Sequence, residues 1–160
     1  MNIKLRINEL NLQPGAEVNP KDLKKYEFQS LGLVDRIVKR LPPGQAVFKT
    51  KNCTVDCFDN QLSLFPCTHE YLTHDRRWKT QASVLLVNGR VQKVEFHVVD
   101  GVYAAHNFLE KFKTICSEYF GDPKQKQKNL FQWTNDSLSF SGFLHADNVT
   151  ADFSIECLDD

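Results

Sequence analysis

Several features that would define a functional class are missing from this chain of 160 residues. Its single methionine is the first residue, which excludes an adaptable Met-rich groove. Its seven glycines are dispersed, so there is no Gly-rich phosphate loop and we expect no cofactor. The Gly-x-Ser-x-Gly element of serine hydrolases is also missing.

Charge bias and long apolar runs are missing as well. The 20 basic residues balance the 20 acidic ones, so we expect no bulk attachment to nucleic acid or to an anionic membrane. No stretch approaches the roughly 18 apolar residues of a membrane span, and no signal peptide is visible. The five cysteines form no Cys-x-x-Cys pair. These absences predict a cytoplasmic protein with free thiols.

The clearest positive signal is a hairpin. Residues 80–87 and 91–99 alternate in polarity as half-buried strands do, and Asn88-Gly89 between them favours a tight turn. Regular pairing around a two-residue turn would mix apolar and polar residues on each face. We therefore predict a three-residue connection, or a two-residue turn followed by a bulge. This register puts Ala82, Val84, Val94 and Phe96 on one face and Lys93, Glu95 and His97 on the wetter face.

One helix is predicted before this hairpin and one after it. Apolar residues at helical spacing predict a helix over 105–120, which Gly121 stops. Asn19-Pro20 predicts the start of an earlier helix over 20–41, with a kink near Ser30.

The remaining elements complete the predicted fold. Strands are expected at 2–9, 46–50, 53–58 and 61–65, and an antiparallel meander at 130–133, 137–143 and 149–157, after a polar connection at 123–128. The sequence predicts one α+β domain over residues 1–160, an antiparallel β-sheet with two main helices packed on one face. Because the order strand, helix, strands occurs twice, a tandem pair of β-α-β-β units, with halves 1–87 and 88–160, is the more specific alternative.

The densest group of reactive side chains lies in the segment 66–79. The candidate zinc ligands there are Cys67, His69, His74 and Asp75. Their spacing matches no strong zinc signature, so a polar surface loop is the simpler interpretation and a metal-dependent hydrolase is the alternative. Cys67, with the two histidines near it in sequence, is also the one candidate nucleophile. The histidines elsewhere, at positions 97, 106 and 145, are expected to be surface or cap residues.

The same segment carries residue types that dominate protein interfaces: Tyr71, Arg76, Arg77 and Trp78. A long aromatic and basic loop on a sheet scaffold is typical of a recognition surface. We therefore predict a non-catalytic module of the inhibitor, immunity or adaptor type that binds a protein partner through these residues.

Two further binding modes stay open. A single-stranded nucleic acid could be bound by charge and stacking, using Arg76, Arg77, Lys79, Lys124, Lys126, Lys128, Phe131 and Trp133. The neutral overall charge argues against this second alternative. An exposed edge strand could also pair two copies of the chain across a dimer axis.

The loop hypothesis predicts that combining Arg77→Ala with Trp78→Ala abolishes partner capture, because desolvated arginine and tryptophan side chains carry much of the energy of an interface. Capture is measured by pull-down from the native host, and the circular dichroism spectrum should be unchanged. Undiminished capture would remove the loop from the interface.

Overall fold

The computed structural model describes residues 5–7, 10–25, 28–30, 41–58, 61–66, 77–98, 102–145 and 150–158. Its strands are β1 (Leu5–Ile7), β2 (Leu10–Asn11), β3 (Gln29–Ser30), β4 (Gln45–Phe58), β5 (Gln61–Pro66), β6 (Arg77–Val87), β7 (Arg90–Val98), β8 (Lys124–Gln127), β9 (Leu130–Thr134), β10 (Leu138–Leu144) and β11 (Ala151–Cys157). These described strands form one 11-stranded sheet in the order β2-β1-β5-β4-β6-β7-β11-β10-β9-β8, and β3 pairs with β4 off this path. The described pairs are antiparallel except for β1 and β5.

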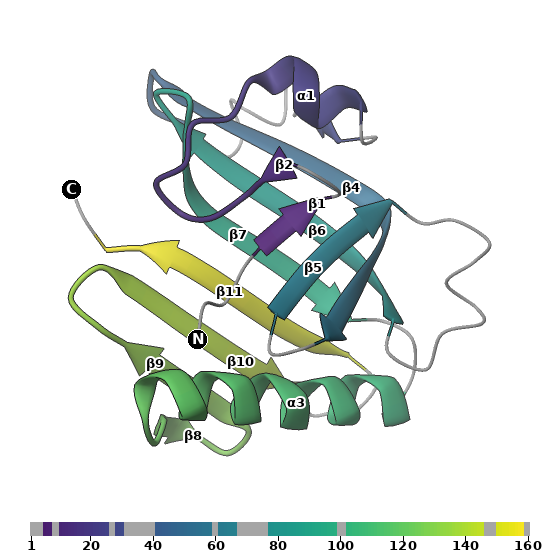
Figure 1. Cartoon of the computed structure of the whole chain (residues 1–160), viewed down its shortest axis with the longest axis vertical. Helices are drawn as coiled ribbons and strands as arrows, with labels where there is room; N and C mark the ends of the chain where they lie inside the picture. The colour runs from purple at the N-terminus through teal and green to yellow at the C-terminus, as the bar shows by residue number, and fades with distance from the viewer. Residues whose placement is uncertain are drawn as a thin grey trace.

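The predicted α+β fold with two main helices, and the tandem pair of β-α-β-β units with it, is wrong. The sheet dominates the molecule, and the described helices are the short α1 (Pro20–Lys25) and the long α3 (Val102–Phe120), at opposite ends of the curved sheet (Figure 1). The predicted helix over 20–41 ends early because the Phe28 N–H donates a 3.1 Å hydrogen bond to the carbonyl of Leu23 and the Phe28 side chain enters the core. The chain then pairs with β4 as β3. Residues 26–27 and 31–40 lie outside the described part.

The hairpin of β6 and β7 confirms the predicted two-residue turn and bulge. Asn88 and Gly89 both have positive φ, at 52° and 79°, as a tight turn requires. The register shifts between Leu85 and Leu86, which leaves Gln92 as the extra residue of β7. As predicted, Ala82 and Val84 lie opposite Phe96 and Val94, while Gln81, Ser83 and Leu85 lie opposite His97, Glu95 and Lys93.

Other strands depart from the predicted bounds. The segments 46–50 and 53–58 form one strand, β4, with a register shift between Thr50 and Cys53. The predicted polar connection at 123–128 contains β8, which pairs with β9 at the edge of the sheet. Because β8 alternates lysine and glutamine, it has no apolar face to signal a strand. The predicted meander is confirmed as β9, β10 and β11.

One part of the core lies between α3 and one face of the sheet. Phe96 of β7 stacks on Phe153 of β11 with ring centroids 5.3 Å apart, and Phe112 of α3 lies 4.8 Å from Phe153. The buried Trp133 donates its indole N–H to the Ser117 hydroxyl at 3.3 Å, so its polar atom is satisfied. Since these apolar side chains occupy one face, the residues between them along β7 and β11 belong to the other face.

Gly142 lets α3 approach β10 closely, so we expect Gly142→Ala to destabilise the fold by about 1–3 kcal/mol. An added Cβ would lie 3.1 Å from Cδ1 of Leu109 and 3.3 Å from Cδ1 of Phe153. Urea denaturation measures the loss, and Thr134→Ala, at an exposed position of β9, is the control. Equal stability of the two variants would contradict this close packing of α3 against β10.

Candidate binding site

The candidate site lies on the face of the sheet opposite α3. Lys93, Glu95 and His97 alternate along β7 with buried apolar residues. Asp152 and Ser154 alternate in the same way along β11. The antiparallel register sets Asp152 opposite His97 and Ser154 opposite Glu95. Chain segments far apart in sequence thus bring their polar side chains together.

This arrangement continues across the neighbouring strands. One row of facing positions runs from β9 to β4 through Gln132, Ser141, Ser154, Glu95, Ser83 and Lys49. All of these side chains are half-buried or exposed, and none is apolar. We call this row, together with Lys93, His97, Asp152 and His145, the polar face.

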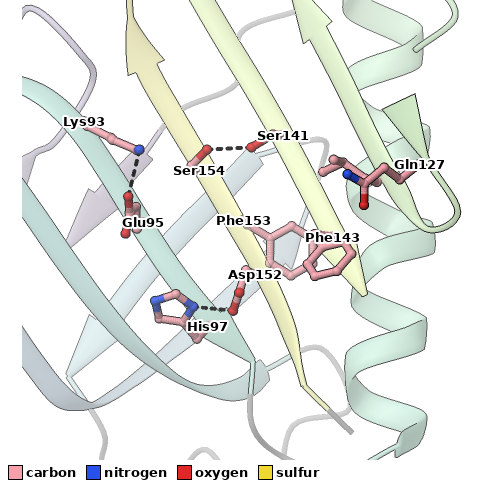
Figure 2. A pocket seen from close by; sticks show the side chains of 10 residues that line it. Lys93, Glu95, His97, Gln127, Ser141, Phe143, Asp152, Phe153 and Ser154 are labelled. Carbon is pink, nitrogen blue, oxygen red and sulfur yellow. Dashed lines mark hydrogen bonds and ion pairs between the residues drawn. The ribbon is translucent and has the colours of Figure 1, made fainter. Parts of the chain in front are cut away.

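The Asp152 carboxylate is shared by two histidines. Its Oδ1 bonds with Nδ1 of His97, and its Oδ2 lies 2.5 Å from Nε2 of His145. His145 directly follows β10, so the cluster joins β7, β11 and the end of β10. Figure 2 shows His97 and Asp152 facing each other across β7 and β11. The three side chains are 36% to 40% exposed, so a ligand can reach them.

The ionisation of this cluster follows from its contacts. Burial raises the pKa of Asp152, but hydrogen bonds from His97 and His145 and the charges of both histidines outweigh burial, and the net pKa is lowered. An ionised carboxylate only accepts hydrogen bonds, so both histidine nitrogens are donors. The hydrogen bond to Asp152 raises the pKa of His97, supported by the charges of Asp152 and Glu95 and opposed by burial and by Lys49.

Two further pairs of polar groups lie within the face. Nζ of Lys93 lies 2.8 Å from Oε1 of Glu95, and this hydrogen bond, with the charges of Glu95 and Glu156, raises the pKa of Lys93 against the effect of burial. The hydroxyls of Ser141 and Ser154 are 2.6 Å apart (Figure 2). The charges therefore largely neutralise one another.

The polar face is hollowed into a groove. A hollow of about 360 Å³ is lined by charged and hydroxyl side chains of β7, β10 and β11, with Leu130 and Phe143 at its β9 and β10 side. A second hollow of about 260 Å³ shares Lys93 and Glu95 with the first and extends over β6 and β4. The two hollows are therefore neighbours across the strands, and we call them together the groove.

The residues predicted from sequence lie elsewhere. Arg77 and Trp78 are the first two residues of β6, opposite Asp56 and Val55 of β4. The other candidates fall outside the described residues, so the interface and metal hypotheses for them stay predictions: Tyr71, Arg76, Cys67, His69, His74 and Asp75. Within the described ranges, no group of three or more His, Cys, Asp and Glu residues could hold a metal ion.

The cluster around Asp152 was not predicted from the sequence. His97 and His145 were expected to be surface or cap residues, and Asp152 carried no signal of its own. The available signal was the position of His97 and Asp152 on the polar sides of two amphipathic strands. Only the pairing of β7 with β11, across 55 residues, brings the two side chains together.

No family model, curated protein or solved structure matches this chain. Among the helices that the structure describes, none has the length and apolar character needed to cross a membrane. The geometry of the polar face is therefore the basis for inferring function.

The ion pair between His97 and Asp152 predicts a pH-dependent contribution to stability. The raised pKa of His97 stabilises the fold below the ordinary value of 6.5, and this contribution is lost as the pH rises through the raised value. The lowered pKa of Asp152 stabilises the fold above the ordinary value of 3.8, and this contribution is lost as the pH falls through the lowered value. The stability difference between the wild type and His97→Gln should be largest between about pH 4 and pH 6.5.

Chemical denaturation of both proteins from pH 4 to pH 9 measures this difference. The control is His106→Gln, at an exposed position of α3, for which we expect little change in stability at any pH in this range. A difference for His97→Gln that stays constant above pH 6.5 would contradict an ionic bond between His97 and Asp152.

Proposed function

We propose that this protein is a non-catalytic binding module, of the inhibitor, immunity or adaptor type, that recognises a protein partner in the cytoplasm through its polar face. The observation that carries the proposal is the row of polar positions from β9 to β4. The described helix α3 packs on the opposite face, and the polar face keeps half-buried hydrogen-bonding groups within reach of a partner.

The charge pattern favours a protein over a nucleic acid. Binding to nucleic acid depends on cations that neutralise phosphates. Here the Lys93 ammonium is already paired with Glu95, and a phosphate backbone would also meet Asp152. A locally neutral surface of mixed polar groups lacks that excess of cations, which favours a protein partner over a nucleic acid.

The hydrogen bonds favour recognition over nucleophilic catalysis. An Asp–His pair can orient a histidine as a general base. In this groove, however, Asp152 serves two histidines, and the hydroxyls of Ser141 and Ser154 bond to each other. This network fixes the side chains in one arrangement, which reduces the entropy lost when a partner binds.

Of the segment predicted from sequence to bind a partner, the structure describes the part that begins at Arg77. Arg77 begins β6 four positions before Gln81, which pairs with His97, a distance of about 13 Å along the strand. We therefore propose that Tyr71, Arg76, Arg77 and Trp78 extend the interface beyond the His97–Asp152 pair.

Site-specific cross-linking in the native host tests the proposal. A photo-crosslinking amino acid placed at Ser154, in the groove, should form a protein adduct of defined mass, because a partner bound there lies within reach of the probe. The same probe at Ser137, an exposed turn residue before β10, is the control.

The proposal would be refuted by equal adducts at both positions, by adducts to nucleic acid, or by no adduct at Ser154. Asp152→Asn should reduce the adduct, because it weakens the hydrogen bonds that hold His97 and His145 in place.

A further inference from the structure

We propose that the polar face captures one extended segment of its protein partner, laid diagonally across the strands, with an apolar side chain at each end. This inference rests on the proposed function and specifies the part of the partner that is recognised. It follows from the shape of the groove, the chemistry along it and its length.

The groove carries apolar side chains on either side of the Lys93–Glu95 pair. Lys93 and Glu95 line both hollows, of about 360 and 260 Å³, so the two hollows are neighbours on this face. Leu130 and Phe143 line the far side of the larger hollow. The smaller hollow is lined by Leu85, directly opposite Lys93, by Val47 on the next strand, and by Leu41. All of these apolar side chains are only partly buried, so each end can still bury apolar surface of a ligand.

The centre of the groove suits an extended backbone better than a helix. An extended segment carries N–H and C=O groups that need partners, whereas a helix has satisfied most of its own. The hydroxyls of Ser141 and Ser154 and the carboxylate of Glu95 line the groove between its two ends. Since Lys93 and Glu95 neutralise each other, the middle of the segment needs polar groups but no net charge.

The register gives the length of the segment. Phe143 of β10 pairs with Asp152 of β11, which in turn pairs with His97 of β7. Leu85 of β6 pairs with Lys93, which lies four residues before His97 on β7. The spacing between neighbouring strands and the rise per residue along β7 together place the apolar side chains at the two ends about 20–27 Å apart. An extended chain covers this distance in about six to eight residues. Successive side chains of an extended chain point to opposite sides. Two apolar side chains that both face the groove must therefore be an even number of positions apart, either six or eight.

Selection from a peptide library tests this inference on the full-length protein. Phage displaying random twelve-residue segments are panned over the immobilised chain. The enriched segments should carry two large apolar residues six or eight positions apart, with polar residues between them. Leu85→Ser and Leu130→Ser should each weaken the binding of an enriched segment at least about tenfold, because each removes one apolar wall.

Leu158→Ser is the matched control, because Leu158 is the same residue type, is 45% exposed and does not line the groove. Segments without this spacing, segments that ignore both groove variants, or no enrichment at all would overturn the inference. If the probe at Ser154 still forms its adduct, the proposed function survives that failure. If that adduct is missing too, both proposals fall. Retention of a single-stranded oligonucleotide that Leu130→Ser abolishes would also overturn the inference.

Discussion

The pairing of β7 with β11 is the constraint on which the rest of the structure depends. On one side of this pair Phe96 stacks on Phe153, and on the other side His97 meets Asp152. Both contacts need the same register, and a slip of one residue would exchange the two faces. The apolar surface buried on the aromatic side stabilises this register far more than a half-exposed ion pair does. The core therefore holds the polar cluster in place, and the cluster adds little to the choice of register.

The position of α3 explains why the proposed recognition surface lies on the opposite face of the sheet. The helix covers the apolar face of β7, β9, β10 and β11 and approaches the sheet closely at Gly142. With that face filled, the opposite face of these strands can carry polar groups without weakening the core. A rigid sheet also keeps Ser141, Ser154 and Glu95 at fixed spacings, which suits recognition better than a mobile loop would.

Local patterns predicted part of this structure, and contacts distant in sequence decided the rest. The bulge after Asn88-Gly89 followed from sorting apolar and polar residues onto separate faces, which is a local constraint. The helix expected over 20–41 failed because Phe28 enters the core and β3 pairs with β4, neither of which helical spacing reveals. The cluster around Asp152 required the order of the strands, and no motif within a single strand encodes that order.

The self-pairing of Lys93 with Glu95 has a consequence for kinetics. A partner segment that diffuses toward the groove meets little net field from this pair, so its encounter with the groove gains nothing from long-range attraction. Association should then proceed at the rate of uncharged surfaces, on the order of 10⁵–10⁶ M⁻¹s⁻¹, and vary little with ionic strength. Selectivity among competing partners would consequently be determined by the dissociation rate of the complex.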